Sequence, residues 1–136
     1  MMTDGQTPAL LSVCLARYVG NLARSLTFYR DLLGFPVEFA FDSPTGGGAI
    51  LRLLGTGALL ELIQDDTMTS QCLCGRDASH LVLRPADRAA VDALVERLEA
   101  GGRKAVTPDN AYWTDRAVTV LDPDRYQVVI AFPDIG

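Results

Sequence analysis

The sequence repeats one pattern of secondary structure twice, and this repeat limits the folds that the chain can adopt. In each half an apolar strand is followed by a cap residue, an amphipathic helix, a glycine at the helix end and three further strands. The caps Asn21 and Asp87 are 66 positions apart, and the glycines Gly34 and Gly101 are 67 apart. Because each module leaves a sheet face that only another module can bury, the two modules are expected to pair.

Local patterns place both modules in a single domain that spans residues 1–136. Module one covers about 10–65, a polar linker about 66–77, and module two about 78–133. The expected fold class is α+β, because strands and helices follow one another in the order strand, helix and three strands. Helices are predicted at 22–33 and 88–100. Strands are predicted at 10–19, 36–41, 49–54 and 58–63 in the first module, and at 79–84, 103–107, 116–121 and 126–132 in the second.

Charge and cysteine content exclude several classes of protein. The net charge of −5, with Lys104 as the single lysine, argues against nucleic acid as a partner. No basic leader and no apolar run of membrane-spanning length is present, so we expect a cytoplasmic protein without membrane contacts. The three cysteines are an odd number, which predicts no disulfide framework. Cys72 and Cys74 lack the second pair of a zinc site and are interpreted as loop thiols.

Three segments of the chain resemble the vicinal oxygen chelate superfamily of glyoxalases, bleomycin-resistance proteins and extradiol dioxygenases. They read NLARSLTFYRDLLGF, SHLVLRPADRAAVDALVERLEAGG and DPDRYQVV, and together they span nearly the whole chain. The end region, with Tyr112 and Trp113 before VTVLDPD, is most similar to a glyoxalase-like subgroup with an incomplete metal site. The resemblance implies two βαβββ modules that form a curled mixed sheet around a cleft, with the helices on the outside.

The same resemblance implies where the metal ligands of the family would lie. They fall on Cys14, Glu61, His80 and Val129, and valine cannot coordinate a metal. A catalytic metal needs about three protein ligands, which a thiolate at Cys14 would supply together with Glu61 and His80. In the interpretation that we favour, Cys14 is a small buried hydrophobe and His80 is a hydrogen-bonded strand residue. We therefore predict no cofactor, with one divalent metal ion as the alternative.

Strand alternation identifies further side chains of the expected cleft, because successive residues of a strand point to opposite faces. If Glu61 faces the cleft, Leu60 and Leu62 pack against the helix. The same rule selects the polar candidates of the other strands, which are Arg52, His80, Thr119 and Gln127. A few converging polar groups among apolar neighbours are typical of a small-molecule pocket.

Three features near the cleft have two interpretations each. Arg52 and Glu61 either bind a ligand or pair with each other as buried charges. Tyr112 and Trp113 either stack on a planar ligand, or have a structural role in which they close the end of the sheet or pack at a dimer contact. The triple glycine at 46–48 is expected to be a flexible connector, with a lid over the cleft as the alternative.

Together these features predict a glyoxalase/bleomycin-resistance-like binding protein. It would be a metal-independent homodimer that encloses a hydrophobic or planar ligand in the cleft. The alternative is a divalent-metal-dependent lyase or dioxygenase-like enzyme, with His80 and Glu61 as candidate catalytic residues. A third hypothesis is a metal-free lyase or isomerase in which His80 is the general base and Arg52 stabilises an enolate. The sequence leaves open whether modules pair within one chain or across two.

Overall fold

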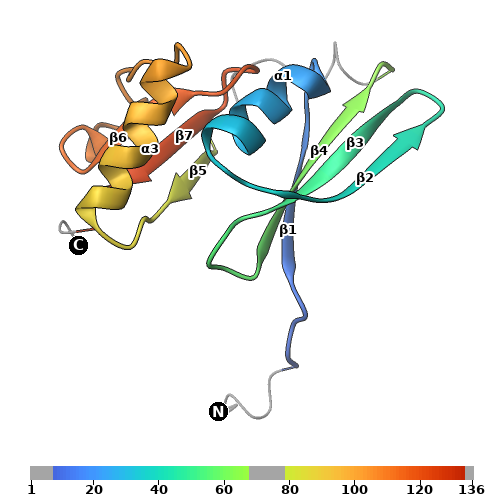
Figure 1. Cartoon of the computed structure of the whole chain (residues 1–136), viewed down its shortest axis with the longest axis horizontal. Helices are drawn as coiled ribbons and strands as arrows, with labels where there is room; N and C mark the ends of the chain where they lie inside the picture. Colours follow the sequence, from blue (N-terminus) through green and yellow to red (C-terminus); the bar gives the residue numbers. More distant parts are fainter. Residues whose placement is uncertain (1–7, 68–78, 134–136) are drawn as a thin grey trace.

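The structure is a computed structural model, and it describes residues 8–67 and 79–133. Most of the predicted linker, with Cys72 and Cys74, lies outside the described residues. The two modules lie side by side, with the helix of the first beside the helix of the second (Figure 1). Within the described residues, no helix is long and apolar enough to span a membrane.

Module one has the predicted order of strand, helix and three strands. β1 (Val13–Tyr18) leads into α1 (Leu22–Leu26), which continues as a π-helical segment, η2 (Thr27–Leu32). The remaining strands are β2 (Val37–Ser43), β3 (Gly46–Arg52) and β4 (Ala58–Asp65). The sheet order is β1-β4-β3-β2, with β1 parallel to β4 and antiparallel pairing between the other neighbours.

Module two repeats this arrangement with fewer strands. It contains β5 (His80–Leu83), α3 (Arg88–Ala100), a short 3-10 helix, η3 (Ala111–Trp113), β6 (Ala117–Leu121) and β7 (Gln127–Ala131). The order β5-β7-β6, with β5 parallel to β7, matches the order β1-β4-β3 of module one. The predicted α+β class with two related modules is confirmed, and hydrogen bonds group the strands into two sheets.

Both helices begin at the predicted cap residues. The side chain of Asn21 accepts a hydrogen bond from the backbone N–H of Arg24 at 3.0 Å, and Asp87 accepts one from Ala90 at 2.8 Å. Gly34 has the left-handed φ of +83° expected after a helix end. Because the caps satisfy N–H groups that have no partner within the helix, these boundaries follow from local sequence.

The strand predicted at 103–107 is wrong. The segment makes an isolated bridge, in which the N–H of Val106 donates to the carbonyl oxygen of Thr119 at 2.8 Å. Pro108 follows two residues later and has no N–H group to donate, so the ladder cannot extend in that direction. The chain instead turns toward η3.

The triple glycine at 46–48 is part of β3, and its prediction as a flexible connector is wrong. All three glycines pair with β4 on one side and with β2 on the other. A Cβ atom on Gly48 would lie 2.6 Å from the carbonyl oxygen of Leu62 and would also collide with the ring of Phe41. The absence of a side chain therefore lets neighbouring strands and the Phe41 ring approach closely, which a reading of glycine as flexible overlooks.

The DPDRYQ turn of module two joins the two modules. The carboxylate of Asp122 accepts a hydrogen bond from the Tyr29 hydroxyl at 2.6 Å and one from the backbone N–H of Tyr126 at 2.9 Å. The guanidinium of Arg17 lies 4.4 Å from the centroid of the Tyr126 ring. Arg17, Tyr29, Asp122 and Tyr126 are all buried. A polar network therefore connects β1 and η2 of one module to the turn before β7 of the other.

This junction predicts a loss of stability at alkaline pH. Burial and the neighbouring Asp122 carboxylate raise the pKa of Tyr29 well above its ordinary value of 10.0. The unfolded chain releases this proton near pH 10 while the folded chain retains it, so the free energy of unfolding falls as pH rises beyond 10. We expect urea titrations on either side of that pH to show a smaller decrease for Tyr29→Phe than for the wild type. Equal decreases in both proteins would contradict this assignment.

Candidate functional site

Alternate residues of β4 point to opposite faces of the first sheet, as predicted. Leu60 and Leu62 are 1% and 0% exposed and belong to the core cluster that contains Phe28 and Tyr29. Glu61 is half-buried on the opposite face. We call this opposite face, which the α1 layer does not cover, the open face.

Glu61 and Arg52, two of the predicted cleft residues, lie on the open face. Glu61 is the cross-strand neighbour of Ile50, and its Oε1 atom lies 3.9 Å from Sγ of Cys14. Arg52 forms an ion pair with Glu38, with 3.8 Å between Nη1 and Oε1. The pair that forms is therefore Arg52 with Glu38, and not the predicted alternative of Arg52 with Glu61. Because both members are about half exposed, this ion pair contributes little to stability.

The thiol of Cys14 is held in its protonated form. Desolvation, followed by repulsion from the Glu61 carboxylate, raises the pKa of Cys14 above its ordinary value of 9.0. Cys14 is also exposed in the single chain, and its predicted role as a buried hydrophobe does not hold there.

A pair of aromatic rings also lies on the open face. The rings of Phe39 and Phe41 stack with 6.3 Å between centroids and 24° between planes. The strand register places Phe39 beside Ile50, which in turn is beside Glu61, so the rings share the face of Glu61. Phe39 is 59% exposed. Sequence reasoning missed this pair, although the alternation of residues in β2 already places both rings on one side.

The other predicted cleft residues lie on the second sheet. The register places His80 beside Gln127 and Thr119 beside Val129. Gln127 accepts a hydrogen bond from the backbone N–H of Asp109 at 3.1 Å and donates one to the Asp109 carboxylate at 2.6 Å. Thr119, Gln127 and Val129 are at most 5% exposed, whereas His80 is half-buried. The two hydrogen bonds to Asp109 therefore fix the position of the Gln127 side-chain amide.

The predicted aromatic pair is found in this same segment, within η3. Tyr112 and Trp113 meet edge to face with 5.0 Å between centroids. The guanidinium of Arg84 lies 5.9 Å from the Trp113 ring, and that of Arg116 lies 4.2 Å from the Tyr112 ring. Trp113 is half-buried, while Tyr112 is 47% exposed. Each ring therefore contacts the other ring and an arginine side chain, and Trp113 is partly packed beside the second sheet.

The donor set of one chain does not fit the divalent ion that the family implies. Cys14 and Glu61 lie on the first sheet, whereas His80 lies on the second. Across residues 8–67 and 79–133, no three His, Cys, Asp or Glu side chains lie close enough to hold a metal ion. Val129, at the fourth ligand position, is fully buried.

Two modules of matching strand order, each with one helix on one face of its sheet, define an α+β protein of paired, related units, in which a single bridge at Val106 stands where module two would have its second strand. The chain belongs to the Glyoxalase/Bleomycin resistance protein/Dioxygenase superfamily, whose family model matches residues 12–130. No curated protein matches the sequence at a significant level.

Solved structures share the fold at low sequence identity. The YycE protein of unknown function from Bacillus subtilis is 24% identical, with a TM-score of 0.76 over 93% of this chain and 91% of that one. Glyoxalase I of Leishmania major is 22% identical, with a TM-score of 0.69 over 93% and 88%. TnmS3, an antibiotic binding protein from Streptomyces sp. CB03234, is 22% identical, with a TM-score of 0.66 over 93% and 98%. At these identities the similarity establishes the fold alone.

Proposed function

We propose that the protein is a metal-independent homodimer that binds a hydrophobic, planar small molecule on its open face. The observation that carries this proposal is the stacked pair of Phe39 and Phe41 on a sheet face that the α1 layer leaves uncovered. Exposed apolar patches on soluble proteins commonly mark binding surfaces, and flat rings stack on flat ligands. Arg52 and Glu61 supply the polar groups that would orient the ligand.

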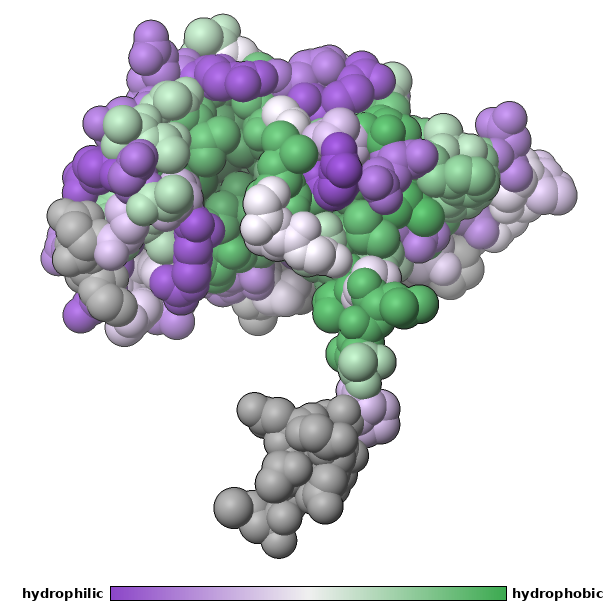
Figure 2. Space-filling view, turned by 60° about the horizontal axis from the view of Figure 1, so that its bottom comes forward, coloured by the Kyte–Doolittle hydropathy of each residue, from purple (hydrophilic) through white to green (hydrophobic). Residues whose placement is uncertain are grey.

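A second copy of the chain is proposed to cover the ligand. β1 is an edge strand, and its start projects from the molecule as a hydrophobic patch (Figures 1 and 2). Val13 and Leu15 are 58% and 44% exposed, and the preceding Leu10 and Leu11 are more exposed still. An unpaired strand edge with exposed apolar side chains favours association with another chain, and β5 is a comparable edge on the second sheet.

Solved neighbours include a small-molecule binding protein of the same fold. One solved neighbour is an antibiotic binding protein, and another is a glyoxalase, so the same fold carries both binding and catalysis. Within one chain the described residues bring no three metal donors together, and Val129 at the fourth ligand position has no donor atom. Both points favour the binding function.

Replacing Phe39 with serine tests the proposed surface. Isothermal titration calorimetry with two planar probes, anthraquinone sulfonate and acridine orange, would detect binding and the preference for charge. We expect Phe39→Ser to lower the affinity for the more tightly bound probe by about tenfold, because the stacked ring and the area that it buries are lost. Val106→Ser is the control, since Val106 is also an exposed apolar residue, at 37%, but lies beside Thr119 of the second sheet.

Two further measurements decide between binding and its alternatives. Sedimentation equilibrium should give a dimer, and a monomer that still binds both probes would remove the second copy from the proposal. Probe binding should be unchanged by EDTA. Failure of both probes to bind, or equal losses in Phe39→Ser and Val106→Ser, would refute the open face as the site.

The enzyme alternatives require residues that this chain places on different sheets. His80 and Arg52, the base and the anion stabiliser of the metal-free hypothesis, lie on β5 and β3. The metal-dependent hypothesis needs His80 together with Cys14 and Glu61, so its ligands would come from two copies. A stoichiometric content of divalent metal in protein purified without chelator, lost in both Glu61→Gln and His80→Gln, would favour that enzyme over the binding function.

A cytoplasmic location is part of the same proposal. Cys14 is a free thiol, and reducing compartments keep thiols in this state. Fractionation of source cells followed by immunoblotting should place the protein in the cytoplasmic fraction. Recovery from the culture medium or from washed membranes would contradict this location.

A further inference from the structure

A cavity of about 620 Å³ lies between the two modules, away from the open face. Ala58 lines it from β4 and shares the helix side of the first sheet with Leu60 and Leu62. Leu81 and Leu83 line it from β5 and pack against the helix-side core. The cavity therefore lies on the helix sides of both sheets, with Val82 and Arg84 bordering it from the other side of β5. Its volume lies within the range of small-molecule sites.

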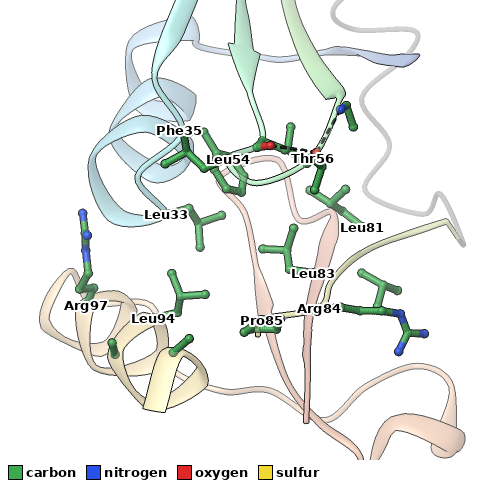
Figure 3. Close-up of a pocket in the computed structure, with 15 residues that line it drawn as sticks. Leu33, Phe35, Leu54, Thr56, Leu81, Leu83, Arg84, Pro85, Leu94 and Arg97 are labelled. Atoms are coloured by element: carbon green, nitrogen blue, oxygen red, sulfur yellow. Dashed lines mark hydrogen bonds between the residues drawn. The ribbon is translucent and has the colours of Figure 1, made fainter. Parts of the chain in front are cut away.

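The inner walls of the cavity are apolar. In Figure 3, Leu33, Leu83 and Leu94 point into the space from the end of η2, from β5 and from α3. The space-filling view shows hydrophobic surface around a hollow between the two modules, with hydrophilic residues at its border (Figure 2). Such walls suit a hydrocarbon, because each buried methylene contributes about 0.8 kcal/mol.

Two arginines mark the margin of the cavity, and none of its lining residues is acidic. Arg84 and Arg97 extend from the margin on opposite sides in Figure 3. Arg97 donates to the backbone oxygen of Asp31 at 2.6 Å, which does not neutralise its charge. Among the described residues, the ion pairs within 4.0 Å involve other arginines. Two cationic groups without carboxylate partners are notable in a chain of net charge −5.

We propose that this cavity binds an apolar carboxylate. The hydrocarbon lies between β5 and α3, and the carboxylate accepts hydrogen bonds from a guanidinium at the margin. Charge complementarity selects an anion over a neutral or cationic molecule of the same shape, because charge-assisted hydrogen bonds to arginine are stronger than neutral ones. This site is separate from the open face and takes a flexible chain where the open face takes a planar ring.

Calorimetric titration with dodecanoate, below its micellar range, tests the proposal on the full-length protein. Dodecanoate should bind with one molecule per chain. The neutral dodecanol should bind at least about tenfold more weakly. Ala93→Phe places a ring in the cavity from α3 and should lower the affinity for dodecanoate by about tenfold or more. The matched control is Ala89→Phe, because Ala89 is exposed on the same helix but does not line the cavity.

Charge variants separate the guanidinium contribution from the apolar one. The double variant Arg84→Gln with Arg97→Gln should lose the preference for dodecanoate over dodecanol. Arg24→Gln should retain it, because Arg24 lies on α1 and does not line the cavity. Neither Ala93→Phe nor the double variant should change binding of the planar probes, so failure of one site is distinguishable from failure of the other. Equal affinity for acid and alcohol in the wild type would overturn the proposal. Unchanged dodecanoate binding in a folded Ala93→Phe variant would also overturn the proposal. This holds even if the variant changes the oligomeric state.

Discussion

Asp122→Ala is expected to lower the free energy of unfolding by about 3 kcal/mol. The Asp122 carboxylate accepts hydrogen bonds from the Tyr29 hydroxyl and from the backbone N–H groups of Asp124 and Tyr126, at 2.6 to 2.9 Å. Alanine would remove the acceptor of these three hydrogen bonds at a buried position, where water cannot easily replace it. Urea denaturation followed by circular dichroism measures the loss.

Two variants isolate the role of the Asp122 junction. Asp115→Ala removes an exposed carboxylate and should change stability by less than about 0.5 kcal/mol. Asp122→Asn keeps the shape but cannot titrate. Burial raises the pKa of Asp122 above its ordinary value of 3.8, so the folded state holds this proton more tightly than the unfolded state. The advantage of the wild type over Asp122→Asn should therefore be largest in acid and should fall as pH rises through the raised pKa. An advantage that grows with pH would show that the carboxylate is stabilised in its charged form.

Gly48→Ala is expected to lower the free energy of unfolding by about 2 kcal/mol. The added Cβ atom would lie 2.6 Å from the carbonyl oxygen of Leu62 and would collide with the Phe41 ring, so strand or ring must move. Because Phe41 stacks on Phe39, the same change should also weaken binding of the planar probe to the open face. Thermal denaturation and calorimetry measure the two effects on the same sample.

Gly57→Ala is the control for the Gly48 substitution. No atom lies within 4 Å of the position that a Cβ would take at Gly57, and its φ is compatible with alanine. Alanine there should leave stability unchanged or raise it slightly, because it restricts the unfolded chain. If both glycine variants lose the same stability, close packing at Gly48 is not the cause.

Short-range signals explain why much of the fold could be predicted. The caps at Asn21 and Asp87 act through hydrogen bonds to residues three positions away, so the sequence alone locates both helix starts. The alternation of β4 correctly placed Leu60 and Leu62 in the core, because period-two burial is a property of the strand itself. The repeat of these signals identified the two modules before any contact between them was known.

Predictions that depended on neighbouring strands were less successful. Residues 103–107 were assigned to a strand from their place in the repeat, but Pro108 and the lack of further partners leave a single bridge at Val106. The glycines at 46–48 looked mobile because their composition is permissive, whereas β2 and β4 hold them on both sides. Composition describes the freedom of the unfolded chain, and pairing decides how much of it remains.

The sequence by itself determined the family of this protein, its two modules, the helix boundaries and the face on which each strand residue lies, because these follow from local periodicity and capping. Only the tertiary structure decided which candidate residues meet. It placed Cys14, Arg52 and Glu61 on one sheet and His80, Thr119 and Gln127 on the other. It also exposed the Phe39–Phe41 pair and joined the modules through Asp122. Contacts between residues 93 positions apart depend on how whole elements pack, which no local pattern in the chain specifies.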